Sequence, residues 1–315
     1  MNIEWDSSSG VLLRREALAL GYDDHAIYRN LRLGVWHRIR MGAYVDAAVW
    51  TSLDAVGRHR LTARAVLKTA HPSAVLTHVS SVVERGAAVW NVDLSEVHIT
   101  RTDGVAGRRE AGVVHHRGDL DPAEVEIVNG VPVSAAARSA LELTTMAGVE
   151  SSLVSTNWLL REKATTKAEL EALVARFRHW PGSLRSDLVV RLSDGRCGWP
   201  GEARTGHLLW SQHVPAPQPQ YEVRGLDGHL IGIVDFAWPE FGVFLEFDGA
   251  IKYERLRREG ETLEDVIRRE KRREEQICAQ TGWVCIRITW DDLAHPAATA
   301  RRIRALLDSR RPVAG

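Results

Sequence analysis

Residues 231–252 constrain this chain most, because two apolar runs joined by a Pro-Glu-Phe-Gly turn carry three carboxylates. Asp235 ends the first run, and the second run carries Glu246 and leads into Asp248. Alternate side chains of a strand share a face, so Glu246 and Asp248 point the same way, with Asp235 nearby on a hairpin neighbour. Three carboxylates beside Lys252 form an oxygen-rich pocket that suits a hard cation such as Mg²⁺. This pattern indicates phosphodiester chemistry on nucleic acid.

The overall charge of the chain does not identify a partner. The 315 residues suffice for two or three domains of roughly 100–150 residues each. Lys and Arg together number 41, as do Asp and Glu, so any nucleic-acid site must be a local patch. Cys197, Cys278 and Cys285 are widely spaced, which fits a reducing cytoplasm. We expect a cytoplasmic protein with no membrane association, because no signal peptide or transmembrane stretch is apparent.

The first fifty residues have the order of a winged helix-turn-helix. We expect a helix over residues 11–20 that Gly21 ends, and a second helix that Asp23 or Asp24 caps. This second helix runs to residue 33, where Gly34 fits the position just past its end. Short strands over residues 35–39 and 43–45 then form the wing.

The second helix and the wing concentrate basic residues, and no acidic residue lies between His25 and Val45. Such a cluster suits phosphate contacts, with an amide and an arginine available for base edges. Two alternatives remain open: a solvated helical hairpin with ordinary surface arginines, and a protein-docking module. The candidate DNA-binding residues are Arg29, Asn30, Arg32, Arg38 and Arg40.

The middle of the chain carries weaker signals. We expect helices around residues 61–69, 134–146, 149–163 and 166–177, and strands over residues 97–100 and 113–116. The pair His115-His116 suggests a metal site, but no carboxylate or third histidine lies at a helpful spacing, so we interpret it as a strand end with one exposed histidine. Residues 77–81 could form a site, but we interpret them as the start of a packed helix.

The last third of the chain predicts a mixed sheet flanked by helices. A helix containing Glu202 precedes the acidic hairpin, and a highly charged helix (residues 263–280), a strand (283–289) and a closing helix (297–307) follow it. We therefore expect an α/β multidomain protein with a winged helix-turn-helix over residues 1–52, a mixed α/β domain over 53–180 and an α/β/α domain over 181–315.

Residues 199–309 resemble the PD-(D/E)XK nuclease superfamily, in particular its branch related to very-short-patch-repair endonucleases. The resemblance implies a restriction-endonuclease-like fold, with Asp235 and Glu246 as the metal-binding acids and Glu202 as a supporting acid on the first core helix. The residues that carry it are Glu202, Val234-Asp235-Phe236, Glu246-Phe247-Asp248-Gly249, Lys252, Glu270-Lys271-Arg272-Arg273-Glu274, Gly282-Trp283 and Arg287-Ile288-Thr289-Trp290.

The chain departs from the superfamily pattern at Asp248, which stands where a lysine is usual. Lys252 lies four residues further on, where related proteins often place a histidine, and it or Lys271 could take the role of that lysine. In this interpretation the acids, with Asp248, hold Mg²⁺ or Mn²⁺, and a lysine orients the attacking water. The nearby Arg268, Arg272 and Arg273 would grip the DNA backbone.

An alternative is that these arginines satisfy the acids in a structural ion-pair network, so that a degenerate nuclease fold binds without cutting. Geometry separates the two hypotheses. Asp235, Glu246 and a lysine converging within roughly 2–5 Å of a common point would favour catalysis. Arginines filling that space would favour a non-catalytic regulator.

Residues 10–165 resemble the antitoxins of AbiE-type toxin–antitoxin systems. The residues that carry this resemblance are Gly34-Val35-Trp36 and Gly42-Ala43-Tyr44-Val45. It implies a transcriptional repressor that binds its own promoter, and it is compatible with a toxin partner without requiring one. Operator binding by a winged helix is also compatible with a homodimer. The function expected from the whole sequence is a DNA-binding, Mg²⁺-dependent endonuclease, and the alternative is an antitoxin-like transcriptional regulator.

Overall fold

The computed structural model describes residues 10–104, 107–180, 182–225, 227–249 and 261–311. The chain is a mixed α/β protein, and its contacts divide it into two compact units. The first unit comprises Met1–Leu159 and Lys163–Arg191, and the second comprises Leu160–Glu162 and Leu192–Gly315. The expected division of the first unit into a winged helix and a middle domain stays a prediction.

The first unit begins with a small antiparallel sheet, whose strand order is β1-β3-β2. Asp23 caps α2 by accepting a hydrogen bond of 2.7 Å from the N–H of Ala26, as expected. The first helix is shorter than expected, because Leu12 and Leu13 pair with β3 and are buried. The elements are β1 (Leu12–Leu13), α1 (Arg14–Ala19), α2 (Asp24–Arg32), β2 (Trp36–Arg40), β3 (Ala43–Asp46) and α3 (Ala47–Ser52).

Helix α4 (Ala55–Thr69) connects this small sheet to the rest of the unit. Leu61 and Ala65 on α4 pack in one apolar cluster with Val11 and Val45. The ammonium of Lys68 donates to the carbonyl of Val11 over 2.8 Å. Ala63 and Val66 of the same helix pack in a different cluster, against a larger sheet. Both sheets therefore share α4 as a common support.

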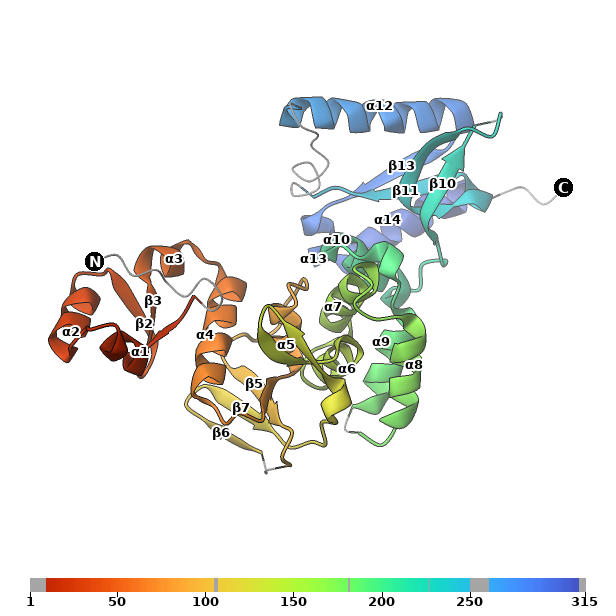
Figure 1. Ribbon diagram of the computed structural model, residues 1–315. Helices are drawn as coiled ribbons and strands as arrows, with labels where there is room; N and C mark the ends of the chain where they lie inside the picture. Colours follow the sequence, from red (N-terminus) through yellow and green to blue (C-terminus); the bar gives the residue numbers. More distant parts are fainter. Residues whose placement is uncertain (1–9, 105–106, 181, 226, 250–260, 312–315) are drawn as a thin grey trace. The chain divides into compact units, whose positions relative to one another are not determined.

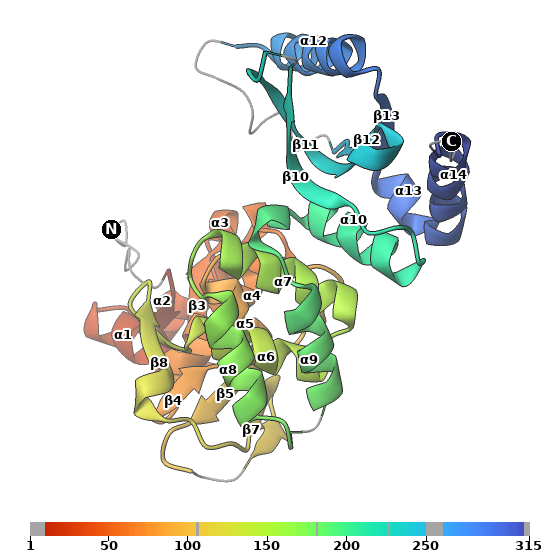
Figure 2. The ribbon, with the colours of Figure 1, turned by 90° about the vertical axis from the view of Figure 1, so that its right-hand side faces the viewer.

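The larger sheet has the strand order β6-β7-β5-β4-β9-β8. Its strands are β4 (Ala74–Leu76), β5 (Val97–Arg101), β6 (Arg108–Glu110), β7 (Val113–His116), β8 (Val125–Val128) and β9 (Val131–Ser134). Helices α5 (His78–Glu84), α6 (Ala136–Met146), α7 (Val149–Arg161), α8 (Lys167–Arg176) and α9 (Ser183–Leu192) accompany it (Figures 1 and 2). Ser134, expected to cap a helix, is instead the last residue of β9, and α6 begins two residues later.

The second unit holds a mixed sheet with the strand order β10-β11-β12-β13. Neighbouring strands β12 and β13 are parallel, because the crossover helix α12 connects them, and the other pairs are antiparallel. The elements are α10 (Pro200–Ser211), β10 (Gln218–Arg224), β11 (Leu230–Trp238), β12 (Val243–Phe247), α12 (Leu263–Thr281), β13 (Val284–Ile288), α13 (Trp290–Ala294) and α14 (Pro296–Ser309).

Helices cover both faces of this sheet (Figure 1). On one face, Trp238 and Leu245 pack with Leu209 of α10 and Ile303 of α14. On the other face, Phe244 packs with Ile277 of α12, and both side chains are fully buried. Alternate residues of β12 thus belong to two cores, as expected for a central strand. Across the described ranges of the whole chain, no helix combines the length and the apolar character needed to cross a membrane.

Candidate functional site

Two acidic side chains meet where β11 and β12 pair. Phe236 lies opposite Leu245 in this antiparallel pair, and continuing the register by one residue brings Asp235 opposite Glu246. Both acids are largely buried, with exposures of 6% and 8%. The Oδ2 atom of Asp235 accepts a hydrogen bond of 2.8 Å from the N–H of Phe247. The side chain of Asp235 therefore reaches across to β12, next to Glu246.

Glu202 lies close to this pair, on the first turn of α10. It is 7% exposed, and its Oε2 accepts a hydrogen bond of 3.4 Å from the N–H of Trp199, which caps the helix. Burial raises the pKa of the Cys197 thiol, and the negative charges of Asp194, Glu202 and Asp235 raise it further. The start of α10 approaches β12 at Gly201, next to Glu202, where a Cβ atom would lie 2.1 Å from Cε1 of Phe247.

Arg273 of α12 provides the cation that faces Glu246. Its Nη2 donates to Oε1 of Glu246 over 2.8 Å, and the same nitrogen lies 3.0 Å from Oε2 of Glu270. Its Nη1 donates to the carbonyl of Ile233 over 2.9 Å. One guanidinium therefore connects α12 to both strands that carry the acid pair.

A second arginine holds Asp248. Nη1 of Arg287 donates to Oδ2 of Asp248 over 3.2 Å, and Arg287 also pairs with Glu274. Arg287 lies opposite Glu246 in the parallel pair of β12 and β13, so the two arginines flank this carboxylate. The small cavity between them is lined by Glu246, Phe247, Asp248, Glu270, Arg273, Glu274 and Arg287. Four carboxylates and two guanidinium groups leave an excess of two negative charges around this cavity.

Of the two predicted lysines, Lys271 does not line this cavity. Lys252 lies outside the described residues, and Lys271 is exposed on α12. Of the three arginines expected to grip DNA, Arg268 pairs with Glu264 over 3.2 Å, Arg272 is exposed, and Arg273 contacts the acids.

The alternative in which arginines satisfy the acids named Arg273 together with Arg268 and Arg272, and the structure brings Arg273 to Glu246. The lining role of Glu270 and Glu274 was not predicted from the sequence. Arg273 and Glu274 follow Glu270 by three and four residues, which puts the three on one helix face and was the available signal. The packing of Ile277 determines that this face of α12 turns toward the strands.

The N-terminal basic residues lie on α2 and β2. Arg29, Arg32 and Arg38 are exposed and Arg40 is half-buried. None of these four forms an ion pair with any residue that the structure describes. The amide nitrogen of Asn30 donates one hydrogen bond of 3.0 Å to the carbonyl of Ala26, within the same helix. Among the described residues, these four cations therefore form no ion pair.

Comparison of the chain with protein-family models and with curated proteins finds no match. The site must therefore be interpreted from its own geometry and charge.

Proposed function

We propose that this protein binds DNA through its N-terminal helix and wing, and that its second unit hydrolyses DNA phosphodiester bonds with the help of Mg²⁺ or Mn²⁺. The observation that carries the proposal is the position of two buried acids on adjacent strands. Asp235 accepts a hydrogen bond from the N–H of Phe247, beside Glu246, and Glu246 lines a cavity whose carboxylates outnumber its guanidinium groups. Hard divalent cations take oxygen ligands of this kind. The mixed sheet with helices on both faces is compatible with a restriction-endonuclease-like fold.

The acids and Arg273 would have different roles at this site. Asp235 and Glu246 would hold the cation, which supplies Lewis acidity and a more acidic water when bound. Glu202, close by on α10, would add negative charge that favours the cation. If a cation replaced Arg273 at Glu246, Arg273 would retain its contacts with Glu270 and with the carbonyl of Ile233. Its guanidinium is therefore placed to stabilise negative charge that develops on a phosphate. This assigns to Arg273 the electrostatic role that the sequence pattern gave to a lysine.

DNA binding is supported by the unpaired arginines of the first unit. Arg29 and Arg32 lie about one turn apart on α2, and Arg38 and Arg40 lie two residues apart on β2. A helix followed by a basic hairpin is the arrangement by which winged helices contact the major groove and the adjacent backbone. One N–H of the Asn30 amide is bonded within its helix, which leaves a second N–H and the amide oxygen for contacts with base edges.

A non-catalytic regulator is the second candidate, and two contacts favour it. Arg273 forms an ion pair with Glu246, and Arg287 forms one with Asp248. This arrangement is expected of a structural ion-pair network. In that case the protein would be an antitoxin-like transcriptional repressor with a degenerate nuclease fold. A second copy of the chain or a toxin would then be its protein partner.

A nicking assay on supercoiled plasmid DNA separates the two candidates. We expect the wild-type protein to nick DNA in the presence of Mg²⁺ or Mn²⁺, and we expect this nicking to cease when a chelator is added. Asp235→Asn and Glu246→Gln should abolish nicking and retain DNA binding in a gel-shift assay. Glu240→Gln is the matched control, because Glu240 is an exposed carboxylate in the turn between the same two strands. Wild-type protein that binds DNA without nicking it would favour the regulator.

A further inference from the structure

Three histidines from separate segments of the first unit converge in one cluster. His78 begins α5, His98 lies in β5, and His116 ends β7. Each offers a ring nitrogen that lies within 4.8 Å of those of the other two. Nδ1 of His98 is 2.7 Å from Nε2 of His116, and the rings of His78 and His116 stack at a centroid distance of 3.5 Å. The interpretation of His115-His116 as a pair with no third histidine in reach is therefore wrong for His116.

Strand register explains why the three meet. Neighbouring strands β5 and β7 are parallel, and Thr100 lies opposite His116. His98 precedes Thr100 by two residues and so shares its face. The hydroxyl of Thr77, next to His78, lies 3.1 Å from that of Thr100. This contact brings the start of α5 to the strand ends, where the histidines face one another.

The protonation state of the cluster suits metal binding. Burial lowers the pKa of His98 to about 4 and that of His116 to about 4, and it holds the pKa of His78 well below its usual value of 6.5. The three imidazoles are therefore neutral at physiological pH, and each keeps a nitrogen lone pair. Metal ions bind neutral imidazole, so no proton must leave before an ion binds.

The surroundings of His78 fix its position. Its backbone has a positive φ of 52°, a conformation that non-glycine residues rarely adopt and that is enriched at functional sites. The N–H of His78 donates to Oε2 of the buried Glu142 over 3.1 Å. Its Nδ1 lies 3.1 Å from the hydroxyl of Thr77. Contacts of this kind orient metal-ligating imidazoles in known sites.

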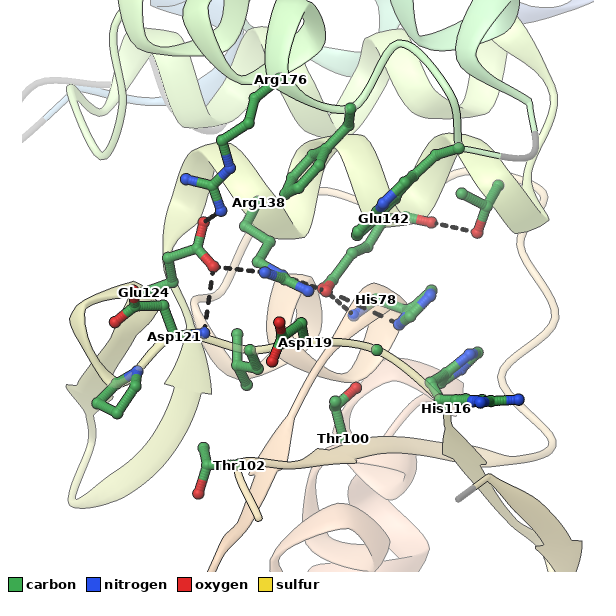
Figure 3. Close-up of a pocket in the computed structure, with 17 residues that line it drawn as sticks. His78, Thr100, Thr102, His116, Asp119, Asp121, Glu124, Arg138, Glu142 and Arg176 are labelled. Carbon is green, nitrogen blue, oxygen red and sulfur yellow. Dashed lines mark hydrogen bonds and ion pairs between the residues drawn. The ribbon is translucent and has the colours of Figure 1, made fainter. Parts of the chain in front are cut away.

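The cluster borders a cavity of about 730 Å³. His78 and His116 belong to its lining, and Figure 3 shows them beside Glu142 and Arg138. The guanidinium of Arg138 bridges Glu124 and Glu142, so it is already neutralised. An ion held by the histidines would be reachable from this cavity for a further ligand.

We propose that His78, His98 and His116 form a binding site for a transition-metal ion of the Zn²⁺ type, with the fourth coordination position open to the cavity. A nitrogen shell at about 2.0–2.1 Å from a tetrahedral ion implies nitrogens about 3.3 Å apart. The present separations, from 2.7 Å up to 4.8 Å, lie on both sides of that value. Because the rings of His78 and His116 are stacked, the imidazoles must rotate to point their lone pairs at one ion. Imidazole ligands select Zn²⁺, Co²⁺ or Cu²⁺ over Mg²⁺, so this site is chemically distinct from the carboxylate site of the second unit.

Titration of the metal-free, full-length protein with Co²⁺ tests this proposal, because tetrahedral Co²⁺ has a characteristic visible absorption. We expect one equivalent to bind with that spectrum and Zn²⁺ to displace it. His116→Ala should lower the affinity by at least about 100-fold. His115→Ala is the matched control, since His115 is also half-buried and precedes His116 on β7 but lies outside the cluster. Glu246→Gln should retain the tetrahedral Co²⁺ spectrum, because Glu246 lies outside the histidine cluster. Failure of the nuclease proposal therefore does not affect this test.

Two outcomes would overturn the proposal. One is no Co²⁺ binding by the wild type, which would make the cluster a hydrogen-bonded part of the core. The other is equal binding by His116→Ala and His115→Ala, which would assign the ion to other groups. If His116→Ala does not fold, X-ray absorption of the Zn²⁺-loaded wild type decides the matter. Three imidazole ligands would support the site, and any shell with fewer would contradict it.

Discussion

The Nη2 atom of Arg273 lies 2.8 Å from Oε1 of Glu246, and this contact determines how a cation can enter the acidic site. The positive partner of the carboxylate comes from helix α12. The residue two positions after Glu246 is Asp248, which adds negative charge instead. A divalent ion must therefore compete with a guanidinium for Glu246.

Removing this competitor should strengthen metal binding. We expect Arg273→Ala to raise the affinity for Mn²⁺ by roughly fivefold, because a partly exposed ion pair of about 1 kcal/mol no longer opposes the ion. The same change should lower the free energy of unfolding by about 1–2 kcal/mol, since the carbonyl of Ile233 and the carboxylate of Glu270 lose a donor. Calorimetric titration and urea unfolding measure the two effects. Arg272 is an exposed neighbour on α12, so Arg272→Ala should change neither the Mn²⁺ affinity nor the stability. Weaker Mn²⁺ binding by Arg273→Ala would contradict this interpretation.

Two glycines of α10 provide a matched pair for testing the packing behind the acids. A Cβ atom on Gly201 would lie 2.1 Å from Cε1 of Phe247, whose N–H holds Asp235. Gly201→Ala should therefore cost about 1–3 kcal/mol of stability and displace the acid pair. At Gly206 the nearest atom is 3.9 Å away, so Gly206→Ala should be neutral or gain up to about 1 kcal/mol from helix propensity. Denaturant unfolding compares them, and equal stabilities would show that α10 does not approach β12 so closely.

The N-terminal arginines should govern DNA affinity and its salt dependence. Each phosphate contact contributes about 0.9 to the slope of log K against log salt, so Arg29→Ala with Arg32→Ala should reduce that slope by about 2. Fluorescence anisotropy with labelled duplex DNA at several salt concentrations measures it. The double variant Arg178→Ala with Arg191→Ala removes the same charge from exposed positions elsewhere in the first unit. Equal losses in both double variants would mean that overall charge, and not the helix and wing, determines binding.

His59 should make the fold sensitive to acid. Its Nδ1 donates to the carbonyl of Leu94 over 2.9 Å, and its Nε2 lies 2.9 Å from the hydroxyl of Ser80. Burial lowers the pKa of His59 below its usual 6.5. As the pH falls below about 6.5, the unfolded chain takes up a proton that folded His59 resists, so stability is lost toward lower pH. The melting temperature of His59→Asn should fall less than that of the wild type between neutral and mildly acidic pH. If the two proteins lose melting temperature equally, His59 is not the cause of the acid sensitivity.

Local signals predicted the parts of the fold that local chemistry determines. The cap at Asp23 and the glycine at position 34 marked both ends of α2, and the turn before Gly242 marked the hairpin that carries Asp235 and Glu246. The strand Leu12–Leu13 was not predictable, because its apolar residues continue a helical pattern and only pairing with β3 makes them extended.

The remaining site features depend on tertiary packing. Which side of the charged helix α12 faces the strands is determined by Ile277. The charge pattern therefore could not decide which of Arg268, Arg272 and Arg273 contacts the acids. His78, His98 and His116 are about twenty residues apart in sequence. The register of β5 with β7 brings His98 and His116 together, and the contact of Thr77 with Thr100 brings His78 to them.

The measurement that tests the central claim most directly is a Mn²⁺ titration of the metal-free protein, followed by electron paramagnetic resonance of the free ion. We expect the wild-type protein to bind Mn²⁺ at a site that is lost in both Asp235→Asn and Glu246→Gln. We also expect Glu240→Gln and His116→Ala to retain this site, because neither residue belongs to the acid pair. No Mn²⁺ binding by the wild type, or equal binding by Glu246→Gln, would contradict the claim that these two acids hold a divalent cation.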